Sequence, residues 1–218
     1  MKYLRLFENF NQSEIDEICR QYKIENYTIN PDGSIDVDGD VTLNWKSLTK
    51  LPLKFNKVSG YFLCTYNKLT SLDGCPNYVG KSFFCQNNEL TNLIGAPIFV
   101  ADNVDCSKNN ITNLIGAPIK VGNTFNCSYN ELTSLDGYPK EVGYISDYIG
   151  NPIYGIIYLF YCNVKIYLEY QETYNFLRKD CKIVKHLLIE ALKDYNEYYN
   201  RSVELPKEIK GYTYIWNT

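Results

Sequence analysis

Four cysteines recur at a constant interval of 21 residues and are the side chains with the clearest capacity for chemistry. They are Cys64, Cys85, Cys106 and Cys127, out of eight cysteines in the chain. Metal-binding cysteines typically occur as Cys-x-x-Cys pairs, and the sequence contains no such pair. If the four stack as neighbouring strands do, about 4.8 Å apart, their parallel Cβ atoms stay farther apart than the roughly 3.5–4.5 Å that a disulfide prefers. We therefore expect small buried apolar side chains.

Residues typical of acid–base or nucleophilic catalysis are sparse. His186 is the single histidine, and no serine or cysteine is placed for it to activate, so we expect a structural role. Asp105 and Asp147 lie two intervals apart, about 10 Å by strand spacing, and we expect solvated surface acids rather than an acid–base pair. Phosphate-loop, Gly-x-Ser-x-Gly and His-Glu-x-x-His motifs do not occur in the sequence. The sequence therefore predicts a protein that is not an enzyme and uses no cofactor.

An acidic stretch, Asp-Val-Asp-Gly-Asp from Asp36 to Asp40, resembles the start of a calcium-binding loop. Such a loop requires glycine at its sixth place and glutamate at its twelfth, where this chain has Val41 and Ser47. We expect no metal there, and interpret the stretch as the lead-in to the first repeat.

A 21-residue repeat positions these side chains. Its unit is Phe-x-Cys-x-x-Asn-x-Leu-Thr-x-Leu-x-Gly-x-Pro-x-x-Val-Gly, and four copies follow one another without an insertion. In one copy Phe83 and Cys85 alternate with Phe84, which predicts a short strand with one face buried. Gly95 and Pro97 disfavour a helix on the return path, so we expect that path to be extended or polyproline-like.

The asparagine of each unit predicts a second regular feature. A side-chain amide both donates and accepts, so the row is expected to bond to the backbone of neighbouring coils. The row comprises Asn67, Asn88, Asn109 and Asn130.

The repeat resembles a leucine-rich repeat, whose core is Leu-x-Leu-x-x-Asn-x-Leu, and is most similar to the short, helix-free repeats of bacterial secreted effectors. Cysteine replaces the second leucine, and Gly-x-Pro replaces the usual proline pair. The layout also resembles uncharacterised repeat proteins of large T4-like bacteriophages, through the Leu-Thr-Ser-Leu-x-Gly-x-Pro lines and the segment NPIYGIIYLF, Asn151 to Phe160. This resemblance implies no particular activity.

We predict an α+β repeat fold, a leucine-rich-repeat-like solenoid with a parallel β-sheet, in three parts. Met1–Asp40 forms an N-terminal cap made of a helix and a β-hairpin that turns near Asn30. Val41–Ile153 holds five 21-residue leucine-rich-like repeats and a partial sixth. Tyr154–Thr218 forms a helical C-terminal cap. Its expected helical stripe comprises Leu177, Cys181, Val184, Leu188, Leu192 and Tyr195, and Trp216 is expected to anchor the last segment.

The outward positions of the repeat strands vary from copy to copy and are the predicted binding residues on a concave face. An apolar start at Leu63 and Phe84 leads to an acidic far end, which suits a protein-docking surface. The predicted protein-binding residues are Leu63, Thr65, Tyr66, Phe84, Gln86, Asp105, Lys108, Asn126, Tyr129 and Asp147. A second exposed apolar set is predicted on the convex side at Ile94, Ile98, Phe99, Ile115 and Ile119.

These features favour a non-catalytic protein–protein interaction module. The net charge of −3 provides no basic surface for nucleic acid. The longest apolar stretch, from Tyr154, is far shorter than the roughly 20 residues of a membrane span. The N-terminus lacks the apolar core of a secretion signal, so we expect a cytoplasmic protein, a monomer or weak dimer, with an unidentified protein partner.

The phage resemblance implies a bacteriophage protein in the host cytoplasm that binds and inhibits a host protein, for example a defence protein. Two alternatives are a structural, self-assembling repeat protein and an enzyme whose site lies between the repeats and Tyr154–Thr218.

Overall fold

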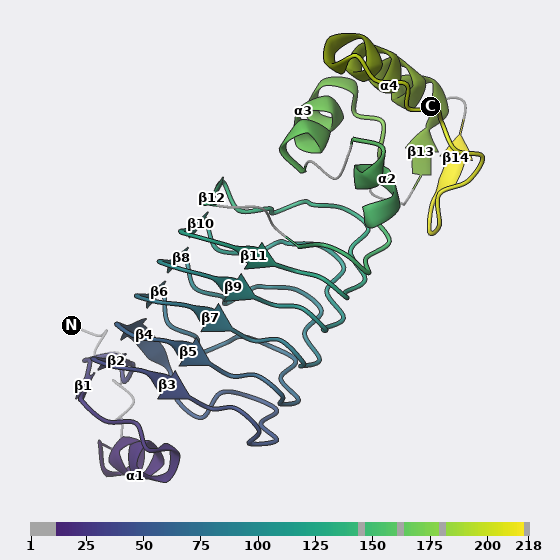
Figure 1. Ribbon diagram of the computed structural model, residues 1–218. Helices are drawn as coiled ribbons and strands as arrows, with labels where there is room; N and C mark the ends of the chain where they lie inside the picture. Colours follow the sequence, from purple (N-terminus) through teal and green to yellow (C-terminus); the bar gives the residue numbers. More distant parts are fainter. Residues whose placement is uncertain (1–11, 144–146, 161–163, 179–181, 216–218) are drawn as a thin grey trace, which may run out of the picture.

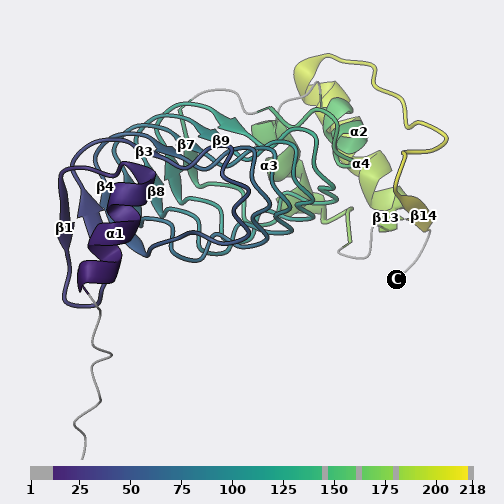
Figure 2. The same ribbon diagram turned by 90° about the horizontal axis from the view of Figure 1, so that it is seen from below.

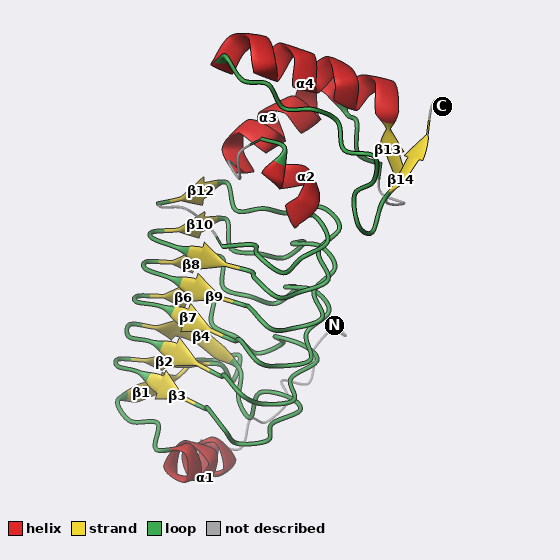
Figure 3. Cartoon of the chain, turned by 45° about the vertical axis from the view of Figure 1, so that its right-hand side comes forward, coloured by secondary structure: helices red, strands yellow, loops and turns green. Residues whose placement is uncertain are grey.

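The chain forms a β-solenoid whose coils stack along a nearly straight axis in the computed structural model (Figure 1). The structure describes residues 12–143, 147–160, 164–178 and 182–215. Figure 3 shows the strands gathered along one side of the stack, with loops completing each coil. The predicted solenoid fold with its N-terminal helix and hairpin and its helical C-terminal region is confirmed.

Each coil contributes two short strands, so the stack carries two sheets. The seven-stranded sheet has the spatial order β1 (Tyr27–Ile29), β2 (Ile35–Val37), β4 (Phe55–Val58), β6 (Tyr78–Val79), β8 (Phe99–Val100), β10 (Lys120–Val121) and β12 (Glu141–Val142). The five-stranded sheet has the order β11 (Phe125–Asn126), β9 (Val104–Asp105), β7 (Phe83–Phe84), β5 (Phe62–Leu63) and β3 (Val41–Thr42). Only the β1–β2 pair is antiparallel among these neighbours.

The second sheet refines the sequence interpretation. The expected strand at Phe83 is present as β7, but the return path also pairs, because β8 hydrogen-bonds in parallel with β6 and β10. Paired residues of neighbouring coils are one repeat apart, since Val79 pairs with Val100 and Phe62 with Phe83. The core therefore consists of rows of like side chains stacked between the two sheets and the loops.

The asparagine ladder is confirmed. The Oδ1 atom of Asn109 accepts from the backbone N–H of Leu90 in the preceding coil at 3.0 Å. Its Nδ2 atom donates to the carbonyls of Cys106 in its own coil and Cys85 in the preceding coil, at 3.1 and 3.2 Å. Asn67, Asn88, Asn130 and Asn151 repeat this pattern. These bonds satisfy polar backbone groups that face the interior.

The glycine of Gly-x-Pro is required by its backbone conformation. Gly116 has φ +89°, and a Cβ atom there would lie 2.4 Å from the backbone nitrogen of Ile94. The equivalent glycines have the same left-handed conformation, at Gly74, Gly95 and Gly137. Only glycine adopts this region without strain, so the turn fixes where each return path begins.

The N-terminal part closes the first end of the stack. Helix α1 (Gln12–Tyr22) buries Ile15 and Cys19 in the same core as the coils and lies across the end of the solenoid (Figure 2). The predicted hairpin turns as expected, because the Asn30 N–H donates to the Ser34 carbonyl at 2.8 Å. Its second strand, β2, pairs in parallel with β4. The hairpin thus continues the seven-stranded sheet.

The C-terminal part follows the last coil with three helices, α2 (Tyr154–Tyr158), α3 (Val164–Tyr174) and α4 (Lys185–Tyr199). Strand β13 (Lys182–Val184) pairs in parallel with β14 (Thr213–Ile215). An aromatic cluster around the fully buried Phe160 joins α3 to α4. Within the described ranges, no helix combines the length and apolar character needed to cross a membrane.

One part of the predicted C-terminal helix is wrong. Leu188, Leu192 and Tyr195 lie buried on α4 as expected. Val184, however, ends β13, and Leu177 forms an isolated bridge with Ile183. The β-branched pair Ile183–Val184 suits a strand, and pairing with the distant β14 overrides the helical pattern. Cys181 and Trp216 lie outside the described residues.

Candidate functional site

The predicted outward residues of the five-stranded sheet come together in one row, here called the strand row. Leu63, Phe84, Asp105 and Asn126 pair in register, and a parallel bridge joins Asn126 to Asp147. The first four side chains are half-buried and Asp147 is exposed. The sequence change along the row, from apolar to acidic, is therefore a change along one continuous surface.

The next predicted positions offer less surface than the sequence indicated. Thr65 is only 6% exposed, and the equivalent Ser107 and Ser128 are also buried. The two serines bond to the residue two positions earlier, at the end of the strand. The Ser107 N–H donates to the Asp105 carboxylate at 2.9 Å, and the Ser128 hydroxyl donates to the Asn126 side chain at 2.7 Å. These residues mainly shape the edge of the sheet.

Gln86 occupies the equivalent position in its own coil and is half-buried. Its Oε1 atom is buried and accepts no hydrogen bond from the described residues. An unpaired buried acceptor carries a desolvation cost of about 1–3 kcal/mol, so a donor that reaches this atom would be favoured.

A column of left-handed residues follows the strand row, one in each coil, here called the left-handed column. It consists of Trp45, Tyr66, Asn87, Lys108 and Tyr129, with φ between 53° and 59°. Bulky residues seldom adopt this conformation, which costs on the order of 1–3 kcal/mol each. The conformation projects side chains into solvent, because Trp45, Tyr66 and Tyr129 are 71%, 41% and 57% exposed.

The first two aromatic residues of this column stack on each other. The ring centroids of Trp45 and Tyr66 lie 3.9 Å apart with an interplanar angle of 9°. Three lysines that lie close to the two rings in the sequence are exposed, Lys46, Lys50 and Lys68. Sequence reasoning missed Trp45 because its coil lacks the marker asparagine, yet counting 21 residues back from Tyr66 reaches it.

A second exposed apolar area lies on the return path, here called the isoleucine patch. Its members are 52–59% exposed and are Ile94, Ile98, Ile115 and Ile119. The adjacent Phe99 is half-buried and stacks on Tyr78, with centroids 5.2 Å apart at 4°. This area corresponds to the apolar set predicted on the second face of the repeats.

The side chains considered above for catalysis or metal binding have structural or surface positions. The four cysteines of the repeat are fully buried and free, and burial raises the pKa of Cys64 and Cys127 to about 12. These thiols pack as small apolar groups, as expected. His186 is exposed in the first turn of α4.

The acidic stretch before the first repeat bonds to the chain itself. The Asp36 carboxylate accepts from the side-chain amides of Asn30 and Asn56. Asp38 accepts from the Ser59 hydroxyl at 2.8 Å. In the described part of the chain, no three metal-ligating side chains gather in one place.

The fold defines the class of the chain, a parallel β-solenoid of about five turns with repeats of about 21 residues. Comparison with protein-family models, with curated proteins and with solved structures gives no match. The function is therefore argued from the residues of the chain itself.

Proposed function

We propose that the chain is a non-catalytic protein-binding module that docks its partner on the strand row and the left-handed column. The observation that carries this proposal is the Trp45–Tyr66 stack, two large aromatic rings held in solvent by a costly backbone conformation. Tryptophan and tyrosine are enriched among the residues that dominate binding energy at protein interfaces. The Asn67 side chain bonds to the backbone of the coil that carries Trp45, and the two rings stack on each other. Because the rings are already positioned, we expect little conformational entropy to be lost when a partner covers them.

The surface around the stack indicates the chemistry of the partner. Half-buried Leu63 and Phe84 continue the apolar area next to the aromatic pair. Three exposed lysines lie close to the aromatic pair in the sequence, and the strand row continues away from the pair to Asp105 and, at its far end, Asp147. Complementary charge favours a partner with an apolar centre and acidic residues near the Trp45 end.

The identity of the partner rests on resemblance alone. The similarity to repeat proteins of large T4-like bacteriophages leads us to propose a host protein, for example a defence protein, that is inhibited by being covered. Leucine-rich-repeat-like sequence features, with cysteine in place of the second leucine, fit the same role, because such repeats present a broad rigid surface.

The test starts with affinity capture of a partner from bacterial lysate, followed by its purification and titration by calorimetry. The double variant Trp45→Ala, Tyr66→Ala is expected to weaken binding by about 30-fold or more, the equivalent of about 2 kcal/mol for an interface hot spot. The matched control is Ile94→Ala, Ile115→Ala, which removes two exposed apolar side chains elsewhere and should leave the affinity unchanged. The reverse pattern, with binding lost only in the isoleucine variant, would place the partner on the other surface and refute the proposal.

Self-assembly is a second candidate because the isoleucine patch exposes four large apolar side chains on adjacent coils. In a symmetric dimer, the isoleucine patch of one molecule would pack against the same patch of a second copy, and both would be buried. Sedimentation velocity over a wide concentration range tests this candidate, with Ile98→Lys, Ile119→Lys as the dissociating variant. A monomer at every concentration would eliminate it.

A further inference from the structure

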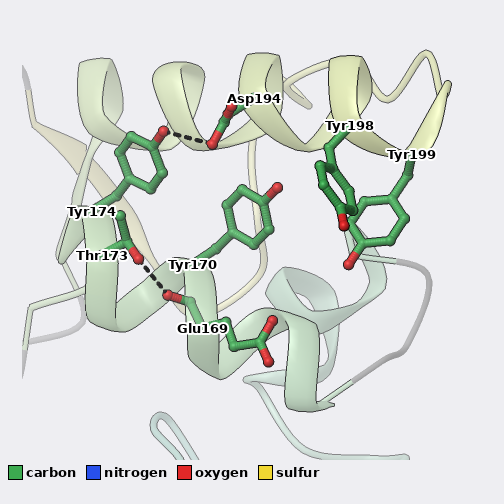
Figure 4. A pocket seen from close by; sticks show the side chains of 7 residues that line it. All are labelled: Glu169, Tyr170, Thr173, Tyr174, Asp194, Tyr198 and Tyr199. Atoms are coloured by element: carbon green, nitrogen blue, oxygen red, sulfur yellow. Dashed lines mark hydrogen bonds between the residues drawn. The ribbon is translucent and has the colours of Figure 1, made fainter.

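A pocket of about 270 Å³ opens between α3 and α4, away from the strand row. Figure 4 shows its lining, which comes from both helices and consists of Glu169, Tyr170, Thr173, Tyr174, Asp194, Tyr198 and Tyr199. Four of these seven side chains are tyrosines and two are carboxylates. The volume is slightly below the roughly 300–1,000 Å³ of sites for drug-sized ligands, so it suits a small molecule.

Contacts between aromatic rings fix the positions of the tyrosines that line the pocket. Tyr170 packs at 5.5 Å from the buried Phe160 and at 5.8 Å from Tyr195, which fixes it in the centre of the site. Tyr174 stacks on Tyr170 with an interplanar angle of 8°. On the other side, Tyr198 meets Tyr199 edge-to-face at 4.7 Å. The four tyrosine rings therefore line an open pocket along the two helices.

The charged side chains that line the pocket are both acidic, Glu169 and Asp194. The Tyr174 hydroxyl donates to the Asp194 carboxylate at 2.9 Å, and this bond together with the charge of nearby Glu190 raises the pKa of Tyr174. Burial and the charge of Asp194 raise the pKa of Tyr170 to about 12. None of the seven lining residues is basic. Both the carboxylates and the faces of the rings attract positive charge.

We propose that this pocket binds a small organic cation bearing a methylated ammonium group. A pocket lined by tyrosine rings and carboxylates suits such groups, because methylated ammonium is large, weakly hydrated and attracted to aromatic quadrupoles. A bare metal ion fits less well, since four of the seven lining side chains are aromatic, whereas a hard cation requires six or more oxygen ligands. The site is independent of the proposed protein-binding surface.

The test uses the full chain and three probes: tetramethylammonium, choline, and 3,3-dimethylbutan-1-ol, the uncharged carbon analogue of choline. Saturation-transfer difference NMR on the methyl protons reports contact with the protein, and calorimetry gives the affinity at matched ionic strength. We expect both cations to bind and the neutral analogue to bind at least about fivefold more weakly, consistent with a cation–π and carboxylate contribution. A further arm with Nα-acetyl-trimethyllysine amide distinguishes a free choline-type ligand from a methylated lysine side chain.

Three variants locate the binding. Tyr198→Leu keeps an apolar side chain but removes a ring that is 78% exposed, and it should weaken choline binding by about threefold or more. Tyr198→Phe should retain it. Asp194→Asn should weaken it by a similar factor, whereas Glu131→Gln, the same loss of one charge at an exposed site on the solenoid, should not.

Equal binding of choline and its neutral analogue would overturn the proposal, as would unchanged choline affinity in both Tyr198→Leu and Asp194→Asn. The absence of saturation transfer to either cation would overturn it directly. An unchanged circular dichroism spectrum and unfolding midpoint in each variant would show that a loss of binding is not a loss of fold.

Discussion

The asparagine ladder provides the sharpest test of how this solenoid is held together. Asn109→Asp preserves the size of a side chain that is only 7% exposed but replaces its donor with a second acceptor. The carbonyls of Cys85 and Cys106 would then face an oxygen instead of an N–H group. Each buried group left without a partner costs about 1–3 kcal/mol, so the free energy of unfolding should fall by about 3–5 kcal/mol.

Urea unfolding followed by circular dichroism measures this change, with Asn110→Asp as the control. Asn110 is the next residue and is exposed, so the same substitution there should change stability by no more than about 0.5 kcal/mol. If the two variants lose the same amount, the ladder does not stabilise the fold and the reasoning is refuted.

The pH dependence of the Asn109→Asp variant adds a second check. Burial next to carbonyl oxygens should raise the pKa of the introduced carboxyl in the folded state above its unfolded value of about 3.9. The protonated form is then favoured by folding. The stability deficit relative to the parent protein should therefore be largest at neutral pH and shrink as the pH falls toward about 4. A deficit that grows on acidification would contradict this assignment.

Four further predictions concern other parts of the fold. Gly116→Ala places a Cβ atom 2.4 Å from a backbone nitrogen at a φ of +89°, and it should cost at least about 2 kcal/mol in urea unfolding. Phe160→Ala removes the ring that contacts Tyr167, Tyr170, Phe176 and Tyr195, and it should cost about 3–5 kcal/mol. The buried solenoid thiols should react slowly with a thiol reagent at pH 7–9 until the chain unfolds. Burial raises the pKa of Cys64 and Cys127 from 9.0 to about 12. Between pH 9.0 and about pH 12 the unfolded chain therefore loses thiol protons that the folded chain retains, so the free energy of unfolding should decline over this range.

The repeat made the solenoid predictable because the same constraint was written several times. Cys85, Leu90 and Val100 each recur at 21 residues; the structure buries the cysteine and leucine rows and pairs Val100 in register with Val79 and Val121. The second sheet was less visible, since strands such as β8 are two residues long and carry no alternation that a sequence window detects.

The features that depend on distant contacts were not predictable from local pattern. Val184 belongs to β13 only because β14, 29 or more residues later in the chain, pairs with it. The tyrosine pocket requires Tyr170 and Asp194 on different helices, and no spacing rule links the two positions. The position of Trp45 could have been predicted from the sequence, because it lies 21 residues before Tyr66, although its coil lacks the repeat asparagine.

The ladder also makes the length of the solenoid adjustable in discrete steps. The bonds of the asparagine ladder that join neighbouring coils connect residues 19, 21 or 24 positions apart, as for Leu90, Asn130 and Cys85 around Asn109. Removing or duplicating one whole coil preserves each of these intervals, whereas any other change in length alters the intervals that span the change. Each step would move the Trp45–Tyr66 stack relative to the tyrosine pocket by about 4.8 Å. The number of coils thus sets the distance between the two proposed binding sites, and hence the geometry of an assembly that engages both.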